Sequence, residues 1–166
     1  MEVPRSFPVE FLPLLRNGNL RQDFGGRCDL CGIVVMVHEG KEIFMKRSEQ
    51  AVENKSRMNC CQAVLAAFPD VTGLSNETAM RLGAAFGSGM GGMDGTCGAL
   101  CGAEMVLGMK AYEGKPLHGK AKAMYRAFFE RAGSTVCREI KGIDTGKVLC
   151  SCEDCVRHAA EIVEEI

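Results

Sequence analysis

The sequence predicts an all-α protein, in which a single small helical domain of about five to six helices follows an irregular N-terminal extension. Two observations carry this prediction. From Met45 onwards, apolar residues recur at helical spacing between helix caps, and no convincing alternating strand pattern occurs. Before Met45, prolines, a glycine pair and a single short apolar run interrupt any helical period. We therefore divide the chain into an extension, residues 1–44, and a cysteine-rich helical domain, residues 45–166.

The composition is that of an ordinary globular domain, and it gives no sign of a highly charged binding partner. The 166 residues suffice for one domain with a hydrophobic core, at 46% hydrophobic and 25% charged residues. The net charge of −1 gives no reason to expect a nucleic acid or an anionic membrane as partner. The longest early apolar run, residues 33–37, is too short to cross a bilayer. We therefore expect neither nucleic-acid binding nor membrane insertion.

The first two helices are expected before a glycine-rich break. One covers residues 45–68 and ends at Pro69, because a residue that precedes proline is driven out of the α conformation. Another covers residues 77–87, with Ser75 as its N-cap and Glu77 in its first turn. Glycines at positions 87, 89, 91 and 92 then interrupt the pattern.

Four more helices are expected after this break. Thr96 is expected to cap a helix over 97–110, and lysines and arginines form the exposed face of a helix over 117–132. Ser134 is expected to cap a short helix over 135–141. The last helix begins after Ser151, where Ser-Cys-Glu-Asp is a capping pattern. Its apolar stripe comprises Val156, Ala159, Ala160, Ile162, Val163 and Ile166.

The extension raises a separate hypothesis about where translation starts. The tripeptide at residues 40–42, Gly-Lys-Glu, can be encoded by a purine-rich ribosome-binding sequence at a suitable distance from the codon of Met45. On this hypothesis Met45 is the true start, and residues 1–44 are translated upstream DNA. Cys28 and Cys31 would then play no role. The nucleotide sequence of the gene tests the hypothesis directly.

Ten cysteines are the unusual feature of the composition. A secreted protein would pair them as disulfides, whereas a cytosolic protein would keep them reduced for metal binding or catalysis. The N-terminus has an acidic residue at position 2, two early prolines and a broken apolar run, which makes a poor signal peptide. We therefore expect a cytoplasmic protein whose thiols serve redox or metal chemistry.

Three cysteines are expected at or near the start of a helix: Cys97, Cys137 and Cys152. The free N–H groups and the positive end of the helix dipole favour the thiolate there. The thiolate is the form that binds metals and attacks disulfides. Cys60 lies late in the first expected helix and lacks this help, so only tertiary packing could bring it to the other three.

The other cysteines allow more than one interpretation. Cys101 shares a helix face with Cys97, and Cys155 shares one with Cys152. The segment 150–155, which includes Cys150, holds three thiols in six residues and is compact enough to hold one soft metal ion. Free cysteine is also among the most buried residue types, so Cys61, Cys101 and Cys155 can equally serve as small core residues.

Gly98 and Gly102 are candidate cofactor-binding positions. Glycines four residues apart on a helix allow a second helix to approach closely. A close backbone also brings N–H groups to the sulfurs of a bound cluster, which would tune its potential. Packing and cofactor binding are compatible, and both stay open here.

The remaining motifs are weak. Residues 87–92 match G-x-G-x-x-G, but they follow a helix and lie outside any βαβ unit, so no dinucleotide is expected. His158 follows Cys155 by one turn, yet a surface histidine is the simpler interpretation. No C-x-x-C-H motif occurs, and covalent haem is therefore not expected.

Four blocks of the sequence stand out together: NCCQAVLAAF (59–68), FGSGMGGMDGTCGALCGAEMVLGMK (86–110), VCREIKG (136–142) and CEDCVRHAAEIVEEI (152–166). They resemble the C_GCAxxG_C_C family of redox-active proteins and occur in the family's order. The resemblance runs from about residue 45 to the end. Carried over residue by residue, the four family cysteines are Cys60, Cys97, Cys137 and Cys152. This chain departs from the pattern by adding Cys61, Cys101, Cys150 and Cys155.

The resemblance implies a redox function. The family is also similar to part of the split-Soret cytochromes, in which an iron–sulfur centre accompanies haem. We therefore expect the four family cysteines to hold an iron–sulfur cluster for electron transfer. The alternatives are a metal-free thiol–disulfide oxidoreductase, with Cys101 or Cys155 as resolving thiol, and a zinc-binding module. Whether the protein is an enzyme or an electron carrier stays open. The redox partner is unknown, and a homodimer is one of the assemblies that remain open.

Overall fold

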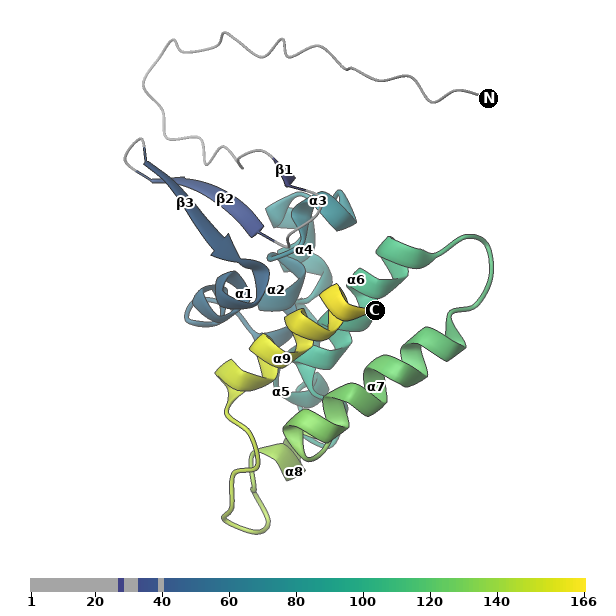
Figure 1. The fold of residues 1–166 in the computed structure, drawn as a ribbon. Helices are drawn as coiled ribbons and strands as arrows, with labels where there is room; N and C mark the ends of the chain where they lie inside the picture. The colour runs from purple at the N-terminus through teal and green to yellow at the C-terminus, as the bar shows by residue number, and fades with distance from the viewer. Residues whose placement is uncertain (1–26, 29–32, 39–40) are drawn as a thin grey trace, which may run out of the picture.

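The computed structural model describes residues 27–28, 33–38 and 41–166 (Figure 1). Strands β1 (Arg27–Cys28), β2 (Ile33–His38) and β3 (Lys41–Lys46) form an antiparallel sheet in the order β1-β2-β3. The described parts of the extension thus contain a small sheet that the sequence analysis did not predict. Strand β3 leads directly into the first helix.

The rest of the described chain is helical, which confirms the predicted all-α domain. There are more helices than the five to six expected, because several are single turns and the first expected helix is divided. In chain order they are α1 (Arg47–Lys55), α2 (Cys60–Leu65), α3 (Pro69–Thr72), α4 (Asn76–Leu82), the 3-10 helix η1 (Ala84–Phe86), α5 (Gly87–Met90), α6 (Gly98–Ala111), α7 (His118–Ala132), α8 (Cys137–Ile140) and α9 (Cys152–Glu165).

The prediction of one helix over residues 45–68 was wrong, because a new helix begins at Cys60. The Asn59 side chain accepts a hydrogen bond from the Gln62 N–H, and the Gln62 side chain accepts one from the Asn59 N–H. This capping box starts α2. Pro69 does not end a helix either; it is the first residue of α3, a position that needs no N–H. Cys60 therefore moves from late in a long helix to the start of a short one.

Helix caps were predicted correctly in two of four cases. Ser75 and Ser151 accept hydrogen bonds from the N–H groups of Thr78 and Asp154 and cap α4 and α9. The N-cap of α6 is Cys97 and not Thr96, a shift of one residue. Ser134 does not cap α8, whose N-cap is Val136. The Ser134 hydroxyl instead accepts from the Val136 N–H and donates to Glu139.

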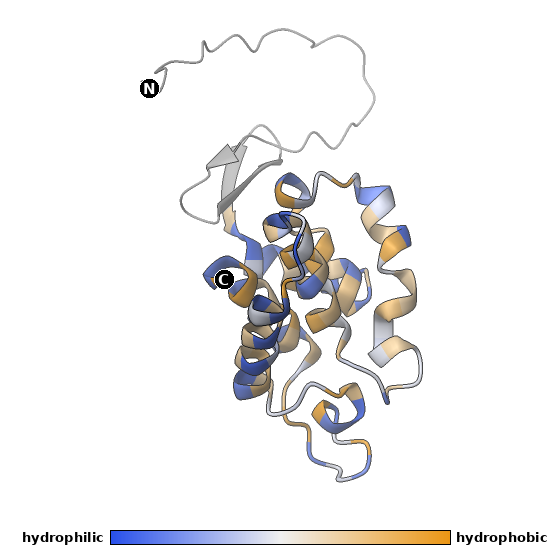
Figure 2. Ribbon diagram, turned by 90° about the vertical axis from the view of Figure 1, so that its right-hand side faces the viewer, coloured by the Kyte–Doolittle hydropathy of each residue, from blue (hydrophilic) through white to orange (hydrophobic). Residues whose placement is uncertain are grey.

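Helix α6 lies at the centre of the domain, packed between α2 and α9 (Figure 1). Helix α6 is hydrophobic all round, as expected of a helix surrounded by other helices. Figure 2 shows the hydrophobic residues gathered among these central helices. Helix α9 buries the predicted stripe of Val156, Ala159, Ala160, Ile162 and Val163, and Ile166 is half-buried. The long apolar faces of α6 and α9 thus form the core.

The approach of α2 to α6 is as close as backbone allows. A Cβ added at Gly102 would lie 2.8 Å from the Cys61 carbonyl oxygen, and one at Gly98 would meet the Phe86 carbonyl oxygen. Both glycines are therefore required for packing, whichever role they have toward a cofactor. None of the helices in the described part of the chain is long and apolar enough to cross a membrane.

We predict that Gly102→Ala destabilises the protein, because the new methyl group would overlap the α2 backbone, which has little room to move. The expected loss is about 1–3 kcal/mol of unfolding free energy in chemical denaturation. Gly108→Ala is the matched control: it lies in the same helix with nothing within 4 Å of the added Cβ. That substitution should stabilise by about 0.5–1 kcal/mol through helix propensity. Equal effects of the two variants would contradict the close approach.

Candidate functional site

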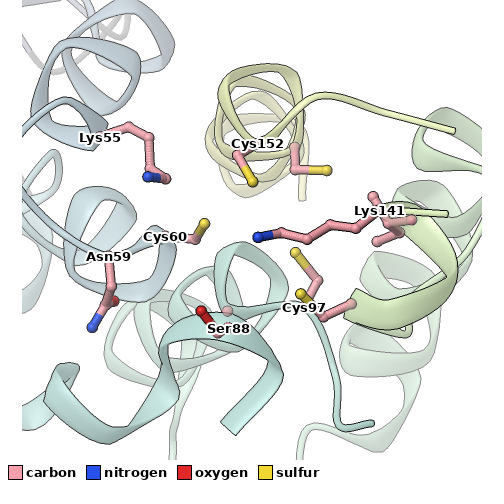
Figure 3. A pocket seen from close by; sticks show the side chains of 11 residues that line it. Lys55, Asn59, Cys60, Ser88, Cys97, Lys141 and Cys152 are labelled. Carbon is pink, nitrogen blue, oxygen red and sulfur yellow. The ribbon is translucent and has the colours of Figure 1, made fainter. Parts of the chain in front are cut away.

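The N-terminal ends of four helices border one cavity of about 170 Å³, which has room for a group of several atoms (Figure 3). Cys60, Cys137 and Cys152 are the first residues of α2, α8 and α9, and Cys97 is the N-cap of α6. The structure therefore brings together the four cysteines that the sequence singled out. The full lining is Lys55, Asn59, Cys60, Ser88, Cys97, Gly98, Cys137, Ile140, Lys141, Cys152 and Cys155.

Backbone hydrogen bonds hold Cys97 beside Cys137. The Cys97 N–H donates to the Thr135 carbonyl at 2.7 Å, and the Cys137 N–H donates to the Gly95 carbonyl at 3.1 Å. These bonds tie the segment before α6 to the segment before α8. Gly89 closes the arrangement, since its φ is +57° and an added Cβ would lie 2.6 Å from the Cβ of Cys137. The glycine-rich loop thus packs against a cavity thiol.

Cys60 and Cys152 form the first of two hydrogen-bonded thiol pairs. The pKa of Cys152 is lowered to about 6, because Cys60 donates to its sulfur and because Lys141 and Lys55 lie nearby. The pKa of Cys60 is raised by the same hydrogen bond and by burial. Of this pair, Cys152 is therefore the thiolate and Cys60 the thiol.

Cys97 and Cys155 form the second pair. The pKa of Cys97 is lowered, because Cys155 donates to its sulfur and the N–H groups of Ala99 and Leu100, in the first turn of α6, do so as well. The pKa of Cys155 is raised by this hydrogen bond and by burial, and Cys150 raises it further. Cys155 therefore serves as a hydrogen-bond donor inside the cavity.

The prediction that helix starts favour thiolates is supported at Cys97, where N–H groups of the first turn of α6 lower the pKa, whereas at Cys152 the lowering comes from Cys60 and the two lysines. Cys97 and Cys152 lie at the starts of α6 and α9, which have 14 residues each, and their pKa values are lowered. Cys137 starts the four-residue α8, and burial and the nearby Cys97 raise its pKa. A single turn supplies too small a dipole to offset burial.

Three of the four additional cysteines lie outside the cavity. Burial raises the pKa of Cys61 to about 12 and that of Cys101 to about 11. Both belong to the hydrophobic core between α2 and α6, as the interpretation of small core residues predicted. Cys150 is half-buried against the core, and burial raises its pKa.

Other candidates do not contribute to the cavity. Gly98 lines it, but Gly102 faces the α2 backbone. The Nδ1 atom of His158 lies 3.5 Å from a carboxylate oxygen of Glu161, and the residue is not part of the lining. Cys28 lies in β1, and Cys31 lies outside the described residues.

Sequence reasoning missed Lys55 and Lys141 as cavity residues. Lys55 ends α1 and Lys141 follows α8. No motif marks either one, because each reaches the cavity only through the packing of its helix. Their positions could not be read from spacing along the chain.

The thiols do not converge on a single point. Within the described ranges, no set of three or more Cys, His, Asp or Glu side chains is grouped so that it could hold a metal ion. The four cysteines instead stand around a cavity.

These features define a class: a small helical protein that gathers free thiols of contrasting pKa around one cavity. The family model described as "Putative redox-active protein (C_GCAxxG_C_C)" matches residues 58–166. The chain belongs to this family, and the match includes all four cavity cysteines at helix starts. Comparisons with curated proteins and with solved structures gave no match.

We predict that one cavity thiol of the metal-free, reduced protein reacts with alkylating reagents well below neutral pH. The Cys152 alkylation rate should rise with pH around a midpoint near 6, because only the thiolate reacts and the pKa is about 6. Replacement of Cys60 with Ala removes the hydrogen-bond donor and should move this midpoint upward. Cys101, with a pKa of about 11, is the internal control. Rates can be followed for each cysteine by mass spectrometry, and equal midpoints for Cys152 and Cys101 would contradict the assignment.

Proposed function

We propose that the protein is an electron carrier that holds an iron–sulfur cluster through Cys60, Cys97, Cys137 and Cys152. The observation that carries this proposal is the meeting of four thiols, from four separate helix starts, around one cavity. Four thiolates complete the ligand set of either common cluster type. The cluster would supply one-electron transfer when bound.

The donor set and the shape of the site fit such a group. Thiolate is the ligand that iron–sulfur clusters use, and the cavity has room for several atoms. Two of the four cysteines are buried, with exposed fractions of 4% for Cys97 and 6% for Cys137, and Cys60 and Cys152 are half-buried. The absence of a three-residue group around one point in the described residues weighs against the zinc module.

The chain's own residues have defined roles in this proposal. Cys97 and Cys152 are poised as thiolates, whereas Cys60 and Cys137 would release protons on binding, since ligand cysteines are deprotonated. Cys155 keeps its proton and donates to the Cys97 sulfur. Hydrogen bonds to ligand sulfurs are one of the factors that set the potential of a cluster.

The first test is anaerobic purification of the full chain, followed by a visible spectrum and assays of iron, sulfide and zinc. We expect brown protein with iron and sulfide, because clusters absorb visible light. Cys97→Ser should lose most of the iron and sulfide. Cys101→Ala, which removes a core thiol outside the cavity, should keep them, and circular dichroism would verify that both variants fold. Colourless, metal-free protein after attempted reconstitution would overturn the proposal.

A second candidate function, thiol–disulfide exchange without metal, is favoured by the Cys97–Cys155 hydrogen bond. The Cys97 thiolate would attack a substrate disulfide, form a mixed disulfide and expel one thiolate. Cys155 would lose its proton and attack the Cys97 sulfur, which forms the Cys97–Cys155 disulfide and releases the second thiolate. The substrate disulfide is reduced by two electrons and the protein dithiol is oxidised.

This candidate predicts a trapped intermediate. If exchange is the function, Cys155→Ala should accumulate the mixed disulfide at Cys97, because the neighbouring thiol that resolves it is gone. Mass spectrometry after incubation with a small disulfide would detect the adduct. Cys61→Ala is the control, since Cys61 is a core thiol that does not line the cavity. Equal accumulation in both variants, or none in either, would count against the exchange function.

A further inference from the structure

Two lysines stand over the thiol cavity, and they are the cationic side chains of its lining among the described residues. Lys55 reaches in from the end of α1 and Lys141 from the segment after α8 (Figure 3). The Lys141 side chain extends across the cavity toward the sulfurs, with its ammonium group on the side of Cys60 in this view. We call Lys55 and Lys141 the lysine pair.

The lysine pair has no carboxylate partner among the residues that the structure describes. Carboxylates on the segments before α6 and after α8 are paired with an arginine: Asp94 and Asp144 both accept from Arg138, at 2.8 Å each. Asp154 accepts from Arg157. No carboxylate lines the cavity, and Glu153 is the acidic neighbour whose charge acts on Cys152. Within this lining the lysine charges thus face the thiols and thiolates and no carboxylate.

The backbone that carries Lys141 is firmly positioned. The Leu149 N–H donates to the Ile140 carbonyl at 2.8 Å, and the Lys141 N–H donates to the Cys137 carbonyl at 3.0 Å. Gly142 has a φ of +64°, and an added Cβ would overlap the backbone of Lys147. The turn from 142 to 147 therefore closes tightly and holds the start of the lysine side chain beside the cavity.

From this geometry we propose that the lysine pair makes the thiol cavity a binding site for an anionic group and raises the reduction potential of whatever cluster it holds. The second part rests on the proposed function. A cluster with four thiolate ligands is anionic and gains one further negative charge on reduction. A nearby cation therefore stabilises the reduced form more than the oxidised form. The lysines act through the electric field of their charges and do not bind the cluster as ligands.

The first arm of the test uses the metal-free protein and two alkylating reagents, iodoacetate and iodoacetamide. Both react with the thiolate by displacing iodide, so a change in thiol pKa alters the two rates equally. Only iodoacetate carries a negative charge. The ratio of the two rates at Cys152 therefore reports the positive charge at the cavity alone. Lys141→Gln should lower this ratio about three- to tenfold at low salt, and added salt should shrink the difference.

The second arm measures the midpoint potential of the loaded protein. Lys141→Gln should make the cluster harder to reduce, with a reduction equilibrium about tenfold less favourable, which is a 59 mV shift to lower potential for one electron. Lys147→Gln is the matched control, because it removes the same charge from an exposed residue in the same turn that does not line the cavity. Lys55→Gln should act in the same direction as Lys141→Gln.

The two arms separate failure of this inference from failure of the proposed function. An unchanged reagent ratio in both Lys55→Gln and Lys141→Gln would overturn the anion site, whether or not a cluster binds. Equal potentials for wild type and Lys141→Gln would overturn the tuning role. If the wild type loads no cluster but the ratio still falls in the Lys141 variant, the proposed function fails and the anion site stands.

Discussion

The close crossing of α2 and α6 is the constraint on which the rest of the structure depends. Gly98 and Gly102 bring α6 so near to α2 that side chains are excluded from the contact at Cys61. Because the two helix starts lie at the same end of this crossing, Cys60 and Cys97 reach the same cavity. Any larger residue at these glycines would push α2 outward and separate the thiols. The glycine spacing is thus a structural requirement that positions the chemistry.

Ion pairs fix the outer surfaces of the bundle, and among the described residues neither cavity lysine takes part in one. Arg47 forms a bidentate pair with Asp70 and stacks on Phe68, which anchors α1 to the start of α3. Arg131 holds the C-terminal part of α9 through Glu165. Helix α9 is therefore fixed along its length by its buried stripe and its surface pairs, while Cys152 at its first residue projects into the cavity. The lysine pair, which has no carboxylate partner among the described residues, lies where thiolates form.

The sequence predicted local features well and tertiary features poorly. Periodicity and caps located α6, α7 and α9 within a residue or two, because these helices are long and amphipathic or wholly buried. The division at Asn59 was missed because a capping box can start a helix inside an apolar run that looks continuous. The four cavity cysteines were identified, three of them from caps and Cys60 only from the family resemblance. The sequence could not predict the lysine pair, the pairing of the thiols or the burial of each cysteine, since all three depend on how distant segments pack.

Burial sorts the cysteines of the helical domain into groups with different chemistry. Cys61 and Cys101 are core residues, and their raised pKa values keep them protonated and unreactive at neutral pH. Cys155 is buried as well, and its raised pKa keeps it protonated. Because this proton is directed at the sulfur of Cys97, Cys155 serves as a hydrogen-bond donor. Cys97 and Cys152 keep lowered pKa values despite partial burial, because neighbouring thiols donate to them. A chain rich in cysteine thus confines its reactive thiolates to one cavity. The surrounding thiols either donate hydrogen bonds to these thiolates or pack in the core.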